Sequence, residues 1–272
     1  MSSSKEMHLL KPEDLFDLEG FHHRDLFAGV NLVWEALPKL KAYLLQAIAV
    51  NPVTGLPLSV PLRATLVVHE GKLLQKGIEI IPGDATKGKM KVVKNGKVLE
   101  GASVLYAGCV LADEGIAIGR GIVVEPGALI KGPTIIGDQT EVRQGAYIRG
   151  TCLVGAHCIV GHTTEIKNSI MLDGAKAGHF AYLGDSILGN NCNLGAGTKL
   201  ANLKLLNAPI TIRIEGKEYP TLLRKLGAIL GDGVQTGCNS VTNPGTILGQ
   251  RSLVYPNTTV KSGYYPPGSV IR

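Results

Sequence analysis

The residues of this 272-residue chain that could do chemistry lie close together, between Arg149 and Asn202. Its side chains include the imidazole of His179 and the cations of Arg149 and Lys167. The pKa of an imidazole lies near neutrality, so a histidine can act as a general base. A guanidinium and an ammonium together can clamp a dianion such as a phosphate. Glu165 stands two positions before Lys167 and would point the same way on a strand.

A six-residue period runs through the part of the chain that carries these residues. Ten branched aliphatic residues recur at this spacing, and the slot four residues after each is mostly small: the series is Ile118, Val124, Ile130, Ile136, Val142, Ile148, Val154, Val160, Ile166 and Leu172. Such a period is too long for one face of a helix and is typical of short strands joined by tight turns. It predicts seven or eight stacked coils of a parallel β-helix.

The period is interrupted twice. It fails between residues 173 and 181 and resumes four residues out of phase, with Tyr182, Leu188 and Leu194 in the aliphatic slot. We expect the chain to loop out there around His179, because a strict coil would bury an inward residue. Residues 203–227 do not fit the period either and should leave the coil as a long loop, a kind of segment that often carries function.

The other segments complete the predicted domain organisation: residues 1–111 form a helical segment plus a small β-subdomain, and residues 112–272 form the β-helix. Apolar residues at helical spacing predict helix over residues 12–48, with a break at Pro38. We expect this helical head to pack near one end of the coils, with Trp34 in a packing role. Residues 49–111 carry short β-rich runs that should cover the exposed first coil, because an open sheet edge tends to aggregate.

Composition limits the classes of partner. With 44% apolar and 18% charged residues the chain should be ordered, and 35 glycines with only 5% aromatics suit tight, repeated turns. A net charge of +6 favours anionic ligands. The densest basic run, residues 87–97, contains no aromatic and suits a solvated hairpin rather than a nucleic-acid site. Without a signal peptide, an apolar run of about 18 residues or a CxxC pair, we expect a cytoplasmic protein with no membrane span.

The cysteines fit the same register. Cys152, Cys158 and Cys192 occupy the small inward slot and should be inert core thiols.

The stretch RGTCLVGAHCIVGHTTEIKNSIMLDGAKAGHFAYLGDSILGNNCNLGAGTKLAN, residues 149–202, resembles a known family. It is similar to the acetyltransferase domain of the bifunctional enzyme that makes UDP-N-acetylglucosamine, a hexapeptide-repeat acyltransferase. KAGHFAYLGD and NLGAGT are close to that family's signature, and the spacing holds without a gap. The resemblance implies a left-handed β-helix and a homotrimer with active sites between neighbouring chains. It also implies acetyl-CoA, or another acyl-CoA or acyl carrier, as co-substrate, and no metal.

The resemblance also assigns roles residue by residue. His179 matches the catalytic base, Glu165 a carboxylate beside it, and Asn202 a residue that contacts the sugar and orients the amine. The backbone N–H of Ala196 matches a donor to the thioester oxygen. Arg149 and Lys167 match the pair that holds the sugar phosphate. Tyr182 and Asn193 match two residues that contact the sugar, and Cys238 matches a second coenzyme-binding position.

The sequence departs from that family after Asn202. The bifunctional enzymes continue with CNYDG and a lysine that touches the phosphate, whereas this chain reads LANLKLLNAP, closer to archaeal-type sugar-phosphate nucleotidyl/acetyltransferases. The cations available to replace the lost lysine are Lys204, Arg213, Lys217, Arg224 and Lys225. No LxAGxGTR-type loop precedes the coils, so we expect no uridylyl transfer. The segment FDLEGFHHRDLFAGVNLVWEALPKLKAYL is similar to the head of short bacterial proteins of the LpxA family.

These observations favour acyl-CoA-dependent N-acetyltransfer to an amino-sugar phosphate resembling glucosamine 1-phosphate. Three alternatives stay open: acyltransfer to a UDP-amino sugar, as in lipid A synthesis; a non-catalytic, ligand-binding β-helix; and a zinc hydratase of the γ-carbonic anhydrase type. His157 and His162 have the five-residue spacing of two zinc ligands in that last class. His179 is a poor third ligand by register, which disfavours it.

Overall fold

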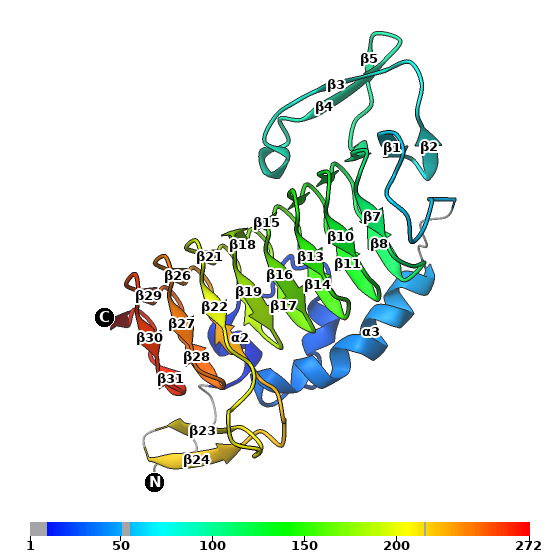
Figure 1. Ribbon diagram of the computed structural model, residues 1–272. Coiled ribbons are helices and arrows are strands. Elements are labelled where there is room, and N and C mark those ends of the chain that lie inside the picture. The colour runs from blue at the N-terminus through cyan, green and yellow to red at the C-terminus, as the bar shows by residue number, and fades with distance from the viewer. Residues whose placement is uncertain (1–9, 51–54, 215) are drawn as a thin grey trace.

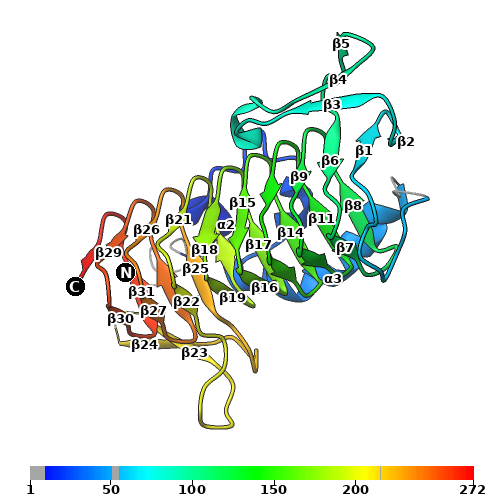
Figure 2. The same cartoon turned by 45° about the horizontal axis from the view of Figure 1, so that its top comes forward.

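The chain winds into a left-handed parallel β-helix of about nine turns, a three-sided prism with one strand of each turn on each side (Figure 1, Figure 2). The computed structural model describes residues 10–50, 55–214 and 216–272. Each strand pairs in parallel with the strands one turn before and one turn after it, so three sheets run the length of the prism. The predicted fold class is confirmed, and the turns slightly outnumber the seven or eight expected.

We number the faces of the prism in the order in which the chain visits them. The first face contains β6 (Ser103–Leu105), β9 (Val123–Val124), β12 (Glu141–Val142), β15 (Ile159–His162), β18 (Lys176–His179), β21 (Asn193–Leu194), β26 (Gln235–Thr236), β29 (Leu253–Val254) and β32 (Val270–Ile271). The second face contains β7 (Val110–Leu111), β10 (Leu129–Ile130), β13 (Tyr147–Ile148), β16 (Glu165–Lys167), β19 (Tyr182–Gly184), β22 (Lys199–Leu200), β27 (Val241–Thr242) and β30 (Thr259–Val260). The third face contains β8 (Ile116–Ile118), β11 (Thr134–Ile136), β14 (Cys152–Val154), β17 (Ser169–Met171), β20 (Ile187–Leu188), β25 (Ala228–Leu230), β28 (Thr246–Leu248) and β31 (Gly263–Tyr265). The first corner joins the first face to the second, the second corner joins the second face to the third, and the third corner leads back to the first face.

The inward aliphatic residues stack in columns that form the core of the prism. Each turn of the prism contains three six-residue repeats, one for each side. Val124, Val142 and Val160 therefore pair in register on successive turns. All three side chains are fully buried. The same spacing that identifies the repeat in the sequence therefore aligns each inward side chain with its counterpart on the next turn.

The second corner is one residue shorter in two consecutive turns. Tyr147 pairs with Glu165 across a full turn, whereas Cys152 pairs with Ser169 across a turn that has lost a residue. The short corners turn at Asn168 and, one turn on, at Asp185, with φ angles of 45° and 49°. Asparagine and aspartate tolerate this left-handed conformation better than most residues.

These short corners make part of the predicted phase wrong. Losing one residue sends the following side chains to the opposite side of the sheet. Leu172 and Tyr182 therefore do not continue the inward column; the inward residues are Met171, Ala177 and Leu183. Leu172 is buried outside the prism, under the N-terminal segment.

The N-terminal segment lies along the outside of the third face (Figure 1). It contains α2 (Pro12–Leu15), the 3₁₀ turns Arg24–Phe27 and Val33–Glu35, and α3 (Ala36–Val50). The expected helix over residues 12–48 is thus mostly wrong: Gly20 and Gly29 adopt φ of 80° and 65°, which a helix cannot contain. Pro38 lies in the first turn of α3, where proline is tolerated.

An apolar stripe on the third face explains this position of the N-terminal segment. Its outward residues include Ile135, Leu153, Ile170, Ile187, Ile229 and Ile247, all buried with the apolar residues of the segment. Trp34 is 2% exposed in the same cluster, in agreement with a packing role. The expectation that the head packs near one end of the coils is wrong, because the stripe runs along the prism.

Residues 55–105 cover the start of the prism. β1 (Leu66–His69) pairs antiparallel with β2 (Lys72–Leu74) and with β6, which extends the first face beyond its first parallel strand. Leu56 and Leu62 join the core of the prism, so the first coil is capped as expected. Whether residues 1–111 are a unit separate from the β-helix stays a prediction.

A three-stranded antiparallel sheet packs on the outside of this end of the prism, where Val92 is buried with Val67 and Val104 (Figure 1). It consists of β3 (Ile78–Ile81), β4 (Lys91–Lys94) and β5 (Lys97–Val98), and the 3₁₀ turn Ala85–Lys87 follows β3. The backbone N–H of Ala85 donates to Glu141 Oε1 at 2.9 Å and ties the sheet to the first face. Lys87, Lys89, Lys91 and Lys97 are exposed, in agreement with a solvated hairpin.

Residues 203–227 leave the coil at the second corner, as expected. They contain the hairpin of β23 (Thr211–Ile214) and β24 (Lys217–Pro220). Ile210, Ile212 and Tyr219 pack into the apolar cluster outside the third face. The preceding loop is different, because Leu205 and Leu206 are 105% and 79% exposed.

The five cysteines are free thiols, and Cys152, Cys158 and Cys192 are fully buried in the small inward slot, as predicted. Burial raises the pKa of Cys152 and of Cys192 to about 12, which disfavours the reactive thiolate. No helix in the described part of the chain is long and apolar enough to span a membrane.

The stacked core predicts a large effect of an inward charge. Val160→Asp places a carboxylate in the column without a partner, which costs several kcal/mol of the free energy of unfolding, measured by chemical denaturation. The matched control is Leu253→Asp on the same face, where the side chain is 44% exposed and the expected change is within about 0.5 kcal/mol. Equal effects of the two variants would contradict the inward register.

Candidate active site

Most of the predicted site residues lie in one band across the second face and its two corners. His179, Ala196 and Cys238 lie at successive turns of the first corner: β18 ends at His179, and the other two each come two residues after a strand of the first face. Tyr182 and Glu165 are neighbours in register on the second face. The residues at the second corner are Arg149, Lys167 and Asn202. The band therefore has a histidine at one end and two cations at the other.

Asn193 is the predicted site residue that lies outside this band. It is exposed on the first face, where it pairs in register with Lys176 and Gln235. Asn193 is the first residue of β21, so it lies on the first face and does not reach the first corner.

The first corner presents His179 to solvent. β18 runs through to His179, which pairs in register with His162 of the preceding turn, and its carbonyl accepts the N–H of Gly197 at 2.9 Å. The expected loop-out at residues 173–181 is therefore wrong, although the imidazole is exposed as expected. Phe180, with φ of 52° and 55% exposed, lies between the two imidazoles at ring-centroid distances of 6.1 Å from His179 and 5.3 Å from His162.

Two coenzyme positions continue this corner beyond His179. Ala196 is half-buried, and its carbonyl accepts the N–H of Asn239 at 2.8 Å. Cys238 is exposed one turn further on. The three residues form a row parallel to the prism axis, along which an extended ligand could lie.

Arg149 and Glu165 form an ion pair where the second face meets the second corner. Arg149 Nη1 lies 2.7 Å from Glu165 Oε1, and this hydrogen bond raises the pKa of Arg149 above its usual value. The guanidinium lies over the ring of Tyr147 at 6.0 Å from its centroid, and Lys131 Nζ lies 5.3 Å from the same centroid. Tyr147 thus gathers two cations beside the ion pair.

The second corner also holds a buried carboxylate that the sequence did not single out. Asp185 is 5% exposed and accepts hydrogen bonds from Lys167 Nζ at 3.0 Å and from Asn168 Nδ2 at 2.7 Å. The side-chain amide of Asn202 also donates to it. Asp185 ends the segment KAGHFAYLGD, so the signal was present, but its importance depends on the short corner that turns its side chain toward Lys167 and Asn202.

Gly184 makes room for this arrangement. A Cβ atom there would come within 2.6 Å of both Asn202 Nδ2 and the Tyr182 hydroxyl. The Tyr182 hydroxyl in turn lies 3.5 Å from Asn202 Oδ1. Tyr182 and Asn202 therefore converge on the space outside Gly184.

The two histidines with zinc-like spacing are not close neighbours. His162 ends β15 at the first corner, and His157 lies two residues before this strand, at the third corner. His157 Nδ1 lies 3.0 Å from the carbonyl of Thr86, and His162 Nδ1 lies 3.0 Å from that of Gln144. Among residues 10–50, 55–214 and 216–272, no group of three or more His, Cys, Asp or Glu side chains is arranged to hold a metal ion.

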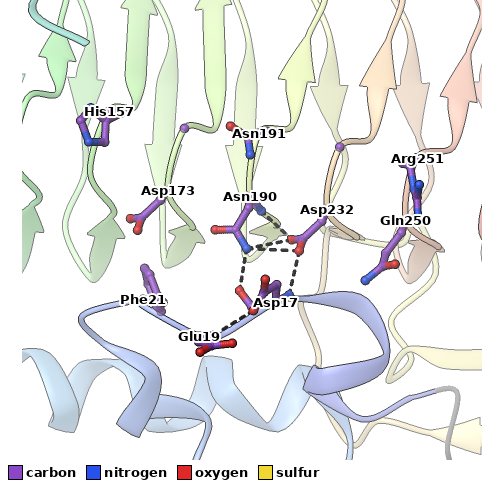
Figure 3. A pocket seen from close by; sticks show the side chains of 12 residues that line it. Asp17, Glu19, Phe21, His157, Asp173, Asn190, Asn191, Asp232, Gln250 and Arg251 are labelled. Atoms are coloured by element: carbon purple, nitrogen blue, oxygen red, sulfur yellow. Dashed lines mark hydrogen bonds between the residues drawn. The ribbon is translucent and has the colours of Figure 1, made fainter. Parts of the chain in front are cut away.

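A cavity of about 640 Å³ lies elsewhere, between the N-terminal segment and the third corner (Figure 3). Asp232 there accepts the backbone N–H groups of Asp17 and Asn190, each at 2.7 Å, and burial raises its pKa. These bonds fasten the N-terminal segment to the prism. The described residues that line this cavity include none of the predicted site residues.

Proteins similar in sequence carry the names of bifunctional proteins. The chain is 44% identical over 103 residues to the "Bifunctional protein GlmU" of Methanococcus maripaludis, covering 38% of this chain and 25% of that protein. It is 37% identical over 101 residues to a "Bifunctional sugar-1-phosphate nucleotidylyltransferase/acetyltransferase" of Sulfurisphaera tokodaii, with coverages of 37% and 25%. The chain thus spans about a quarter of the length of these relatives, and the resemblance drawn from residues 149–202 is confirmed.

Among solved structures, a UDP-N-acetylglucosamine acyltransferase from Campylobacter jejuni aligns with 60% of this chain and 69% of its own, at 17% identity and a TM-score of 0.43.

The family model described as the GMPPB C-terminal domain matches residues 130–270, more than half of the 272-residue chain. This range includes the parallel turns that carry the band from His179 to Arg149. The chain therefore belongs to the GMPPB C-terminal domain family.

Proposed function

We propose that this protein is an acyl-CoA-dependent N-acyltransferase that acts on an amino-sugar phosphate. The observation that carries the proposal is the band across the second face, with an exposed His179 at the first corner and the cations Arg149 and Lys167 at the second. A sugar that bridges the two corners would place its phosphate at one end and its amine toward the other. The acetyltransferase named in the Sulfurisphaera tokodaii relative supports this reaction class.

In the proposed reaction, each residue of the band has one role. Arg149 and Lys167 bind the phosphate, and Asn202 and Tyr182 position the amine. The amine nitrogen attacks the thioester carbonyl carbon, and His179 takes the proton that the nitrogen loses. The N–H of Ala196 stabilises the developing oxyanion. The C–S bond breaks, and the thiolate leaves and receives the proton from His179.

Binding of a dianion must compete with contacts already present. Arg149 is paired with Glu165, and Lys167 is paired with Asp185, so these four groups sum to zero formal charge. Lys131 lies beside the Arg149 pair on the ring of Tyr147. We infer that Lys131 supplies part of the charge that the family's lost lysine would provide. The second candidate function is acyltransfer to a UDP-amino sugar. The altered phosphate site favours it, because a UDP-amino sugar needs an anion site in a different place.

His179→Ala tests the role of the base. Acetyl-CoA consumption with amino-sugar phosphates and UDP-amino sugars should show kcat lower by roughly 10²–10⁴-fold, the usual contribution of general acid–base catalysis. The matched control is His162→Ala, which removes the histidine in register on the preceding turn and should leave kcat within about twofold of the wild type. Full kcat in His179→Ala would exclude this mechanism, and a wild type inactive on every acceptor would favour a non-catalytic β-helix.

Arg149→Ala tests the phosphate end. It should raise KM for a phosphorylated acceptor by roughly 10- to 100-fold with little change in kcat, because it removes charge-assisted binding present before the reaction. Arg143→Ala is the control, since Arg143 pairs with Glu141 on the first face, outside the band. An equal KM effect with an unphosphorylated amino sugar would refute the phosphate role of Arg149.

We further propose that the protein works as a homotrimer with a site between neighbouring chains. The band is open on one chain, and the excursion at residues 203–227 carries exposed leucines: Leu203, Leu205, Leu206 and Leu222. Clustered exposed apolar side chains mark interaction surfaces. A neighbouring copy beside the second face would cover them and close the band.

Light scattering tests the assembly. The expected mass is three times the 28.7 kDa of one chain, and Leu205→Asp with Leu206→Asp should shift it toward the mass of the single chain. A monomer mass for the wild type at assay concentration, with full activity, would contradict the shared site.

A further inference from the structure

Asp185 is a charged residue buried next to the band, and the reaction outlined above does not use it directly. Its side chain is 7% exposed, and that of its partner Lys167 is 20% exposed. A buried carboxylate is unfavourable unless its oxygens are well paired. Here both oxygens accept side-chain donors: Oδ1 from Asn168, and Oδ2 from Lys167 and Asn202.

The ionised carboxylate can only accept hydrogen bonds, whereas the amide of Asn202 can donate at one end and accept at the other. Facing Asp185, the amide must therefore turn its NH₂ group inward. Its Oδ1 then faces the Tyr182 hydroxyl, which lies 3.5 Å away. This carbonyl oxygen is the group that can accept a hydrogen bond from the amine of the substrate and orient its lone pair.

Asp185 also holds a second residue of the same corner. It keeps Lys167 Nζ at 3.0 Å. One carboxylate thus connects the residue that would bind phosphate with the residue that would orient the amine. A bound amino-sugar phosphate has to match the distance between Lys167 and Asn202.

We propose that Asp185 is a positioning residue: it fixes the side-chain amide of Asn202 with the carbonyl oxygen toward Tyr182 and holds Lys167 at a set distance from it. The inference rests on the proposed N-acyltransfer for its role in the reaction, but the orientation of Asn202 can be measured without turnover.

Asp185→Asn tests the proposal with little change of shape. Asparagine tolerates the φ of 49° at this corner, and the backbone bonds of residue 185 to Lys167 and Gly227 do not involve the side chain. Its amide can donate as well as accept, so the Asn202 amide is no longer held in one orientation. We expect kcat to fall by roughly 10- to 100-fold, because a hydrogen bond that orients the amine in the transition state is no longer held in place.

A double-mutant cycle with Asn202→Ala separates positioning from a general structural role. If Asp185 acts through Asn202, Asp185→Asn should reduce kcat little further once Asn202 is replaced. If the two effects multiply instead, the proposal is overturned. Asp173→Asn is the matched control: its carboxylate also supports a corner, accepting the Ala156 N–H at 2.7 Å, but at the third corner. It should leave kcat unchanged.

The orientation itself is measured by nuclear magnetic resonance on protein with ¹⁵N-labelled asparagine side chains. The Asn202 amide signals, identified by their absence in Asn202→Ala, should exchange slowly in the wild type and rapidly in Asp185→Gly. Glycine keeps the positive φ while removing the carboxylate. Unchanged slow exchange in Asp185→Gly would overturn the proposal. A wild type without turnover but with this exchange pattern would refute only the N-acyltransfer, leaving the placement of Asn202 by Asp185 intact.

Discussion

The structure depends on the stacking of like residues in the inward columns of the prism. A branched aliphatic side chain at every repeat meets its counterpart on the next turn, and the backbone of each strand pairs with the turns on either side. Contacts are made almost entirely between neighbouring turns, so each turn needs its neighbours to bury its core. This requirement leaves the corners and outward rows free to vary, and all of the predicted site residues occupy them.

The short second corners show how this freedom is used. A shortened turn keeps the inward column intact only because the residue is lost at a corner, where Asn168 and Asp185 adopt a left-handed conformation. Asp185 is buried at this corner beside Lys167. The corner that deviates from the repeat is therefore the one that gathers the carboxylate, the lysine and the asparagine of the candidate site, and the one from which residues 203–227 depart.

The N-terminal segment divides the surface of the prism between two uses. Its apolar residues cover the outward isoleucines of the third face, and Asp232 fastens its start to the third corner. The second face, with Tyr147, Glu165, Tyr182 and Lys199 in its outward row, carries polar groups that a ligand or a neighbouring chain can use. The N-terminal segment thus buries the third face, and the candidate site lies on the second.

The sequence by itself determined the β-helix, most of the inward columns and the excursion at residues 203–227, because a strict period reports which side chains meet on successive turns. It did not determine the phase between Leu172 and Tyr182, since a residue lost at each of two corners changes which residues point inward there, although Leu188, Leu194 and Leu200 point inward as predicted. It also did not determine where the N-terminal segment packs: helical spacing marks an apolar surface but not its partner, and the partner, the isoleucine stripe, exists only once the turns are stacked. The role of Asp185 was decided in the same way, because its three donors come from the turns before and after it and meet its carboxylate only across neighbouring turns.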